Sequence, residues 1–515
     1  MKFKRNQVKY GLLMLSIKSP LLLLQQQKLT MRIIFTALFF MISLVVFSQS
    51  NTPGITYGGS KYDGGTSLLL RDDGAYVVCG NTKSFGTGSK NMFILIIRKD
   101  GQIVSSKIYG RTHQSNLMSI IPVENGYAFG GYVWDGGMAR HDIYFLKTDL
   151  LGNKLIEGQY GTHEVEKGFN ICKADNNNFL LLGYSRGFTD HKGDIMVVRV
   201  DDEGNELWRN GYGTAYDDYA FDLTGNDTDG YYIIGSAGGF YKDVHANFKN
   251  HDADLLLIKI DKDGNTLWQK QYGETGHDFG YALLKEEHSL YLVGSSQSYG
   301  NGDFDLLLIK TDTAGQEIWH KNYGGDDYEY GYSLAKSVDN HLYLFGTSKS
   351  YGTENTPDYY LVKTDTLGNE VWSLTIGNTG EDYGYKVIAT PDSGCAVVGQ
   401  SSSYGAGDFD MLFVKVSKNG IIQNIVNDID TLEKTGIVVA PNPAKDHIKF
   451  IYNYSENPGQ YLVRFYSVKG DLIEELPLEN SFANYPISFS SGLYIYRVVD
   501  KKTDQIVTLG KLIVQ

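Results

Sequence analysis

The stretch GDFDLLLIKTDTAGQEIWHKNYGGDDYEYGYSLAKSVDNHLYLFGTS, residues 302–348, decides the fold of this chain. It contains four short runs of apolar, β-branched and aromatic residues, and turns rich in Asp, Asn and Gly separate them. Runs of this length and composition without a helical period predict β-strands. Similar stretches occur on both sides of it, so the four-strand unit is a repeat.

A Tyr-Gly dipeptide marks each copy of the repeat. Successive dipeptides are 51 to 53 residues apart, except for one interval of 60 residues in the fourth copy. The first residues of the dipeptides are Tyr57, Tyr109, Tyr160, Tyr212, Tyr272 and Tyr323, with Ile376 in a seventh, degenerate copy. Seven repeats of about 50 residues, each with four strands, predict a seven-bladed β-propeller.

Further columns appear when the copies are aligned on this dipeptide. A glycine closes the second run of every copy: Gly80, Gly130, Gly183, Gly235, Gly294, Gly346 and Gly399. A basic residue ends the third run: Arg98, Lys147, Arg199, Lys259, Lys310, Lys363 and Lys415. Five residues before it stands an aspartate, Asp142, Asp194, Asp254, Asp305, Asp358 or Asp410, with Phe93 in the first copy. We expect Trp208, Trp268, Trp319 and Trp372 on the outer strands to fill the gaps between blades.

Over roughly residues 55–425 these copies resemble the bacterial β-propeller repeat found in secreted and surface proteins. The resemblance implies the architecture and leaves the activity open, because one fold serves many functions. Two segments could close the ring beside the last blade, IIQNIV at 421–426 or GITYGG at 54–59. Either one would remove an unpaired strand edge.

The beginning of the chain predicts export. Residues 1–48 are expected to be an N-terminal extension and signal peptide, with Arg32 before an apolar run of 15 residues at 33–47. That run is short for a spanning helix, which needs about 20 residues. A membrane anchor is the alternative. We take Met31 as the true start and expect no membrane span in the mature chain.

Composition excludes some classes of partner. The formal net charge of −13 argues against nucleic acid. The three cysteines, Cys79, Cys172 and Cys395, are an odd and sparse set that favours buried free thiols over disulfides. No cofactor is indicated. The stretch DKDGN at 261–265 resembles the start of a calcium loop but lacks the later Glu of an EF-hand, which favours a hairpin turn.

An acidic column follows the Tyr-Gly dipeptide. Six positions after its first residue stand Asp63, Ser115, Glu166, Asp218, Asp278, Glu329 and Asp382. Their carboxylates could ring the mouth of the central channel and attract a cation or a polyhydroxyl ligand. Alternatively, each could accept backbone N–H bonds in its own turn. Repetition in nearly every blade favours the second interpretation.

The fourth copy departs from the repeat through about nine additional residues in FYKDVHANFKNHD, 240–252. This insertion lies between the second and third strands, on the loop-rich face of the expected propeller. Its Tyr241, His245, Phe248 and His251 are candidate ligand contacts, and the two histidines are candidates for a metal. The alternative is a tolerated surface insertion.

The repeat ends near residue 426, so the propeller is expected over 51–426 and a linker over 427–436. About seven short alternating runs in 437–515 predict a small immunoglobulin-like β-sandwich. The distinctive residues are Pro441, Asn442, Pro443, Gly470, Gly492, Tyr494, Gly510 and Lys511. With the segments around them, they resemble the C-terminal sorting domain of the type IX secretion system of Bacteroidota. The resemblance implies that this machinery is a partner and that the chain reaches the medium or the outer surface of the outer membrane.

Two functions stay open at this point. The first is a non-enzymatic surface propeller that binds a glycan or a surface protein through its loop-rich face. The second is a secreted enzyme acting on polysaccharide, with its site at the channel mouth. No G-x-S-x-G, H-E-x-x-H or P-loop motif is present. The insertion in the fourth copy is the main asymmetry, and it favours binding.

Overall fold

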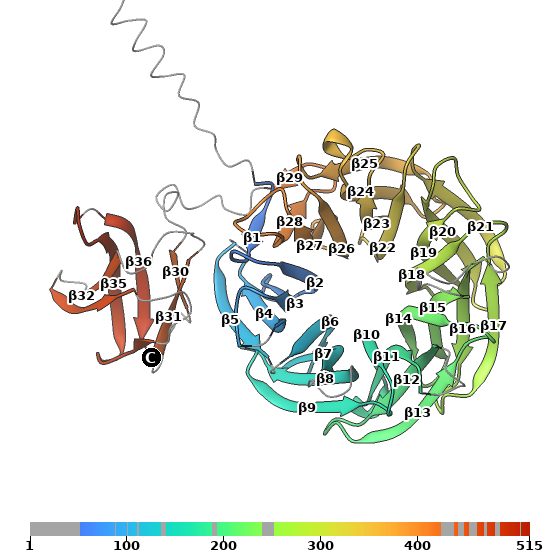
Figure 1. Ribbon diagram of the computed structural model, residues 1–515, viewed down its shortest axis with the longest axis horizontal. Coiled ribbons are helices and arrows are strands. Elements are labelled where there is room, and N and C mark those ends of the chain that lie inside the picture. Colours follow the sequence, from blue (N-terminus) through green and yellow to red (C-terminus); the bar gives the residue numbers. More distant parts are fainter. Residues whose placement is uncertain are drawn as a thin grey trace, which may run out of the picture. The chain divides into compact units, whose positions relative to one another are not determined.

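The computed structural model describes most of residues 52–514 (Figure 1). The residues left out within this range are 88, 100, 111–112, 135–140, 188–192, 239–251, 424–436, 441–446, 453–460, 468–470, 479–484 and 505. Strands dominate, with two short 3-10 helices, η1 (Asp175–Asn177) and η2 (Thr353–Asn355). No helix in the described part of the chain is long and apolar enough to cross a membrane.

Antiparallel sheets of four strands follow one another along the chain, and we number them in chain order. Sheet 1 contains β2 (Asp63–Leu70), β3 (Tyr76–Thr82), β4 (Asn91–Ile97) and β5 (Ile103–Tyr109). Sheet 2 contains β6 (Gln114–Val123), β7 (Gly126–Trp134), β8 (Asp142–Asp149) and β9 (Lys154–Tyr160). Sheet 3 contains β10 (Glu166–Lys173), β11 (Phe179–Ser185), β12 (Asp194–Val200) and β13 (Glu206–Tyr212).

The same order continues to the end of the repeats. Sheet 4 contains β14 (Asp218–Asn226), β15 (Gly230–Ala237), β16 (Asp254–Ile260) and β17 (Thr266–Tyr272). Sheet 5 contains β18 (Asp278–Lys285), β19 (Ser289–Ser296), β20 (Asp305–Asp312) and β21 (Glu317–Tyr323). Sheet 6 contains β22 (Glu329–Lys336), β23 (His341–Ser348), β24 (Asp358–Asp365) and β25 (Glu370–Ile376). Sheet 7 contains β26 (Asp382–Ala389), β27 (Cys395–Ser401) and β28 (Asp410–Val416), with β1 (Ile55–Tyr57) and β29 (Ile422–Gln423).

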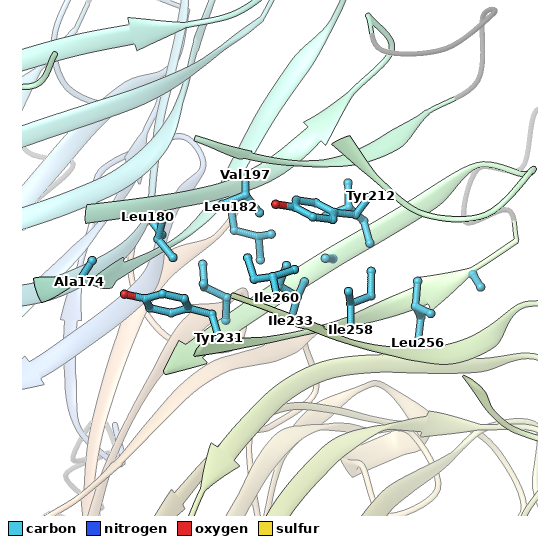
Figure 2. Packing of buried hydrophobic residues seen from close by; sticks show 14 residues of the cluster. Ala174, Leu180, Leu182, Val197, Tyr212, Tyr231, Ile233, Leu256, Ile258 and Ile260 are labelled. Carbon is cyan, nitrogen blue, oxygen red and sulfur yellow. The ribbon is translucent and has the colours of Figure 1, made fainter. Parts of the chain in front are cut away.

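Hydrophobic clusters join each sheet to the next. Figure 2 shows the cluster between sheets 3 and 4, in which Leu180 and Val197 meet Tyr231 and Ile258. A corresponding cluster joins sheet 7 to sheet 1. The sheets therefore close into a ring, with the first strand of each sheet innermost (Figure 1). This is the architecture of a β-propeller.

Both candidate segments take part in closing the ring. β1 pairs with Met411–Phe413 of β28, and β29 pairs with Lys415 and Val416 of the same strand. The outermost position of sheet 7 is thus shared between the beginning and the end of the repeat region. Tyr57 of β1 also contacts the hydroxyl of Ser106 in sheet 1, at 3.0 Å.

The conserved spacing of the Tyr-Gly dipeptide has a physical basis in contacts between sheets. The hydroxyl of Tyr212 donates to the carbonyl of Gly264 in the next sheet, at 2.8 Å. Tyr160, Tyr272 and Tyr323 make the same bond to Gly204, Gly315 and Gly368. The predicted packing of the tryptophans is confirmed, because Trp208, Trp268, Trp319 and Trp372 pack against the clusters between sheets.

The sequence alignment of the first two copies is wrong at three columns, the basic and aspartate columns of the first copy and the glycine column of the second. Arg98 takes the place of the turn aspartates, because its N–H bonds to Gln102 as that of Asp201 bonds to Asn205. The first member of β4 is therefore Asn91, not Phe93, in the column of Asp194. In sheet 2, Gly131 rather than Gly130 pairs with the first strand as Gly183 does. The first copy ends its third strand two residues earlier than the alignment assumed.

A β-bulge explains the glycine that closes the second strand. The first strand of every sheet shifts register just after the residue opposite this glycine, for instance between Gly280 and Ala282. At the bulge the first strand comes close, and a Cβ on Gly294 would overlap the carbonyl oxygen of Phe279. Only glycine fits this approach, and the same overlap recurs at Gly346 and Gly399.

The C-terminal region forms two further sheets. One contains β30 (Ile437–Ala440), β31 (His447–Tyr452) and β34 (Tyr485–Pro486). The other contains β32 (Tyr461–Ser467), β33 (Leu472–Pro477), β35 (Gly492–Asp500) and β36 (Ile506–Val514). Side chains from both sheets, such as Ile448 and Phe465, belong to one hydrophobic cluster.

Candidate functional site at the channel rim

The acidic column is buried between sheets. Asp63, Glu166, Asp218, Asp278, Glu329 and Asp382 are all 0% exposed, as is Ser115 in sheet 2. Their carboxylates accept backbone N–H bonds in their own turns, for example from Gly59 to Asp63 and from Gly325 to Glu329. The interpretation that favoured turn hydrogen bonds is confirmed. The alternative placement of these carboxylates at the channel surface is wrong, because the turns enclose them.

A second carboxyl group lies near each acidic member of this column. The aspartate that begins the third strand of one sheet faces the acidic residue of the next sheet, and the glycine of the Tyr-Gly dipeptide lies against both. A Cβ on Gly377 would overlap carboxylate oxygens of Asp358 and lie 2.6 Å from Asp382. The sheet 1–sheet 2 junction holds neutral Asn91 and Ser115 in place of two acids.

Burial dominates the electrostatics of these pairs. It raises the pKa of Asp410 to about 7, and the neighbouring charge of Asp63 adds to the effect. Burial likewise raises the pKa of Asp218 and of Asp382 to about 6. One carboxylate oxygen of Asp63, Asp382 and Asp410 lacks a hydrogen-bond partner, as expected if a pair shares a proton. The acidic residues are therefore part of the scaffold.

The rim of the channel is formed by the residues that directly follow the acidic column and those that directly precede the third strands. The first set is Gly64, Asn116, Lys167, Tyr219, Phe279, Tyr330 and Tyr383. The second set is Lys90, His141, Gly193, Ala253, Phe304, Pro357 and Phe409. The two sets are joined because each carbonyl of the second set accepts the N–H of an acidic-column residue, as Phe304 does from Glu329.

One part of the rim is aromatic. We call Phe279, Phe304, Tyr328, Tyr330, Tyr383 and Phe409 of sheets 5 to 7 the aromatic arc. The ring centroids of Phe279 and Phe304 are 5.6 Å apart, and those of Phe304 and Tyr330 are 5.4 Å apart. All but Phe304 keep part of their surface exposed. Exposed aromatic faces of this kind offer stacking surface to a planar or sugar ring.

The opposite part of the rim carries basic side chains. We call Lys83, Lys90, His141 and Lys167 of sheets 1 to 3 the cationic arc. Nζ of Lys90 lies 4.9 Å and that of Lys83 5.6 Å from the ring centroid of Tyr62. Burial first, and then the charge of Lys83, lower the pKa of Lys90 to about 8. Burial and then Lys167 also lower the pKa of His141.

Tyr62 joins the two arcs. Its ring centroid lies 5.9 Å from that of Phe409, and its hydroxyl donates to the side chain of Gln400. Burial raises its pKa to about 12, so this hydroxyl is neutral near pH 7. The aromatic arc and the cationic arc are therefore in contact through Tyr62. The residue types at the rim differ from sheet to sheet, although the strands repeat regularly.

Below the rim, the bulge residues of the innermost strands form an aromatic belt. Phe169, Phe221, Tyr281, Tyr332 and Tyr385 contact one another in this order across sheets 3 to 7, with ring centroids 4.9 to 6.0 Å apart. The equivalent residues of sheets 1 and 2 are Thr66 and Met118. The channel beneath the rim is thus lined by apolar rings on most of its circumference.

Unpartnered polar atoms gather near the cationic arc. Asn116 is 1% exposed, and neither its amide nitrogen nor its amide oxygen has a hydrogen-bond partner. Nδ1 of His141 is also buried without a partner. The ring of Tyr132, which is paired with Asn116 across the strands, lies 5.5 Å from that of His141. A buried amide without partners is costly, so these atoms favour a polar ligand at this place.

The structure describes only some of the residues proposed from sequence. Tyr241, His245, Phe248 and His251 fall outside the described residues, as do Pro441, Asn442, Pro443 and Gly470. Gly492 and Tyr494 lie in β35, and Gly510 and Lys511 in β36. Asp261 accepts N–H bonds from Asp263 and Asn265 in a hairpin turn. The three cysteines are free, as predicted, but only Cys79 and Cys395 are buried, whereas Cys172 is partly exposed.

Sequence reasoning missed the rim. The signal was present, since the position after the acidic column reads Tyr219, Phe279, Tyr330 and Tyr383 in four consecutive copies and turns polar in sheets 2 and 3. The alignment of the copies reveals positions that keep one residue type. This position changes from aromatic to polar around the ring, so the alignment did not reveal it. Within the part of the chain that the structure covers, no three His, Cys, Asp or Glu side chains are grouped to hold a metal ion.

Comparisons with known proteins found only distant structural neighbours. No family model and no curated protein matches the sequence. Among solved structures, the WD40 domain of Pan2 from Neurospora crassa is 9% identical, with a TM-score of 0.42 over 70% of this chain and 91% of that domain. Sqt1 from Chaetomium thermophilum is 11% identical, with a TM-score of 0.41 over 72% and 85%. A fungal alcohol oxidase with bound copper is 10% identical, with a TM-score of 0.40 over 90% and 99%. Such distant neighbours include an enzyme, and they assign no activity to this chain.

Proposed function

We propose that this chain is an exported seven-bladed β-propeller that binds a ligand at its channel rim without transforming it. Sheets 1 to 7 are its blades. The C-terminal sheets form an immunoglobulin-like sorting domain for type IX secretion in a bacterium of the Bacteroidota. The expected ligand is a glycan or a surface protein, and the expected location is the medium or the outer surface of the outer membrane.

The observation that carries the binding role is the rim, where exposed aromatic rings and basic side chains surround the channel mouth. Mixed apolar and polar surfaces of this kind are typical of binding sites. The enzyme alternative relied on carboxylates lining the mouth, and the acidic column is instead enclosed between sheets. The binding role therefore has the stronger support.

A glycan array tests the binding role. We expect the chain from residue 49 onward to bind one class of glycan. The double substitution Tyr330→Ala with Tyr383→Ala should abolish the binding, because it removes two rings of the aromatic arc. The matched control is Tyr351→Ala, since Tyr351 is exposed and lies outside the rim. Binding that survives the double substitution would contradict the rim as the site.

Export is tested separately. A chain that ends at residue 426 should stay in the periplasm of a host with the type IX machinery, whereas the full chain should reach the cell surface or the medium. Equal export of both chains would contradict the sorting role of residues 437–515.

A further inference from the structure

We infer that the cationic arc selects an acidic saccharide, one that carries carboxylate or sulfate groups. The inference rests on the proposed binding role of the rim and adds the chemical class of its ligand. The sugar ring would stack on Tyr62 and Phe409, its anionic group would lie on Lys83 and Lys90, and its hydroxyls would bond to Asn116.

The first argument is that the positive charges of Lys83 and Lys90 have no negative partner among the described residues. The chain as a whole carries a formal net charge of −13, yet two lysines lie over one tyrosine ring at the rim. Neither Lys83 nor Lys90 forms an ion pair with a carboxylate among the described residues. The nearby carboxylate of Asp63 is occupied by the hydroxyl of Ser84 and the N–H of Gly59. An incoming anion would relieve the repulsion between the two ammonium groups.

A comparison with another rim lysine sharpens this argument. Lys349 also lies over a tyrosine, with Nζ 5.7 Å from the ring centroid of Tyr328. It is neutralised by Asp327 at 2.9 Å. Among the described residues, the lysines beside Tyr62 have no such carboxylate, whereas Tyr383 of the aromatic arc is bonded to Glu381.

The second argument comes from the buried amide of Asn116. Asn116 is the residue of β6 that directly follows the acidic column, which is the position of Phe279 and Tyr330 in their own strands. It therefore belongs to the rim. The residue is buried, with 1% of its surface exposed, and neither the nitrogen nor the oxygen of its side-chain amide has a hydrogen-bond partner among the described residues. An amide that can donate and accept matches the paired hydroxyl groups of a sugar, and neither a metal ion nor a simple anion would satisfy both atoms.

The third argument excludes a nucleic acid as the anionic partner. Phosphate backbones bind extended basic surfaces and are repelled by a strongly acidic protein. Here the basic residues form one short arc, and acidic residues outnumber basic ones by 60 to 47 in the whole chain. A short acidic saccharide fits one arc of positive charge next to aromatic rings.

The experiment uses the full mature chain and two ligands with the same backbone, tetragalacturonate and its methyl ester, which is neutral. We expect calorimetry to show at least tenfold tighter binding of the acid form. Lys83→Gln with Lys90→Gln should remove this preference, whereas the control Lys270→Gln, at a lysine that lies over Trp268 on the outer strand β17, should retain it. Both lysines are partly or fully exposed, and a thermal melt verifies that the variants fold.

The outcomes separate this inference from the proposed function. Equal binding of the acid and the ester, or an unchanged preference in the double lysine variant, would overturn the choice of an acidic saccharide while the rim remains a binding site. Absence of any saccharide binding on the array would overturn this inference and the glycan as ligand, and would leave a surface protein as the ligand of the rim. A sulfated tetrasaccharide that binds in place of the galacturonate, with the same dependence on the two lysines, supports the inference and identifies the acid as sulfate.

Discussion

Asp410 and Asp63 meet where sheet 7 contacts sheet 1, and both are almost completely buried. Oδ2 of Asp410 accepts the N–H groups of Ala406 and Gly407, which leaves its other oxygen facing the second carboxyl group. Two ionised carboxylates this close repel each other, and burial penalises both charges. The junction is therefore most stable when the pair keeps a proton.

This proton makes stability depend on pH. Burial raises the pKa of Asp410 in the folded chain to about 7, whereas an aspartate in the unfolded chain titrates near its ordinary value of about 4. The folded chain thus retains a proton that the unfolded chain releases, so the stabilising contribution is complete below about pH 4 and is lost as pH rises toward 7. We expect the free energy of unfolding of the wild type to be lower at pH 8 than at pH 5.

Asp410→Asn tests this dependence. The amide oxygen can still accept the turn N–H groups, and its NH₂ can donate to Asp63, as the natural Asn91 permits at the sheet 1–sheet 2 junction. Asp410→Asn should change the free energy of unfolding more favourably at pH 8 than at pH 5. We expect the difference between the two changes to be about 1–2 kcal/mol, measured by urea unfolding. Asp303→Asn, at an exposed rim residue, serves as the control. Parallel pH profiles for wild type and Asp410→Asn would contradict the shared proton.

Lys90 gives a second residue-scale prediction, which concerns ligand binding. Its pKa of about 8 lies well below that of an ordinary lysine, so it loses its charge between pH 7 and pH 9. Affinity for an acidic saccharide should therefore fall about threefold to tenfold over this range in the wild type. Among the described residues, the titratable groups beside it are Lys83 and Tyr62, of which Tyr62 stays neutral. An equally steep fall in Lys90→Gln would assign the titration to another group.

At the scale of the element, the innermost strand is the unit that the repeat preserves. In Asp278–Lys285 an acidic residue faces the neighbouring sheet, an aromatic residue follows at the rim, and the bulge residue joins the aromatic belt. A single bulge thus sets three layers of side chains along the channel. The glycine on the second strand is required because the bulge brings a carbonyl to the place of its side chain.

Gly294→Ala tests this requirement. The added methyl group would overlap the carbonyl oxygen of Phe279, a backbone atom that cannot turn aside. We expect a loss of about 2–4 kcal/mol in the free energy of unfolding. Gly492→Ala is the control, because its Cβ would meet only side-chain atoms at 3.6 Å or more. A loss below 0.5 kcal/mol in Gly294→Ala would mean that the strand can shift, so the bulge would not explain the column.

The elements also show what sequence reasoning can and cannot predict. The four strands and their turns follow from alternation and turn residues within one copy, which is why they were predicted. Contacts between copies are different. The pairing of Asp358 with Asp382 joins residues of two consecutive copies, 24 positions apart in the sequence. The predicted register of β4 was wrong for a related reason. Arg98 is basic like the other residues of its column, although it lies in the turn after the strand.

At the scale of the whole molecule, ring closure joins the beginning of the repeats to their end. β1 supplies three residue pairs to β28, and β29 supplies two. Tyr57 adds a buried ring to the cluster between sheets 7 and 1, where it lies 5.3 Å from Phe93. The contact between sheets 7 and 1 therefore depends mainly on the N-terminal segment, which was one of the two candidates for closure in the sequence.

Removal of residues 49–57 tests the closure. The shortened chain loses the strand and the burial of Tyr57, which alone is worth about 3–5 kcal/mol. We expect a lower melting temperature and rapid proteolysis between sheets 7 and 1. A synthetic peptide of residues 50–60, added in trans, should restore part of the loss because it can pair with Met411–Phe413. Ile422→Asp, which weakens only the two-residue contact of β29, should cost less than half as much. If the two changes proved equally costly, the C-terminal contact would carry as much of the closure as β1, and the ring would be closed from both ends alike.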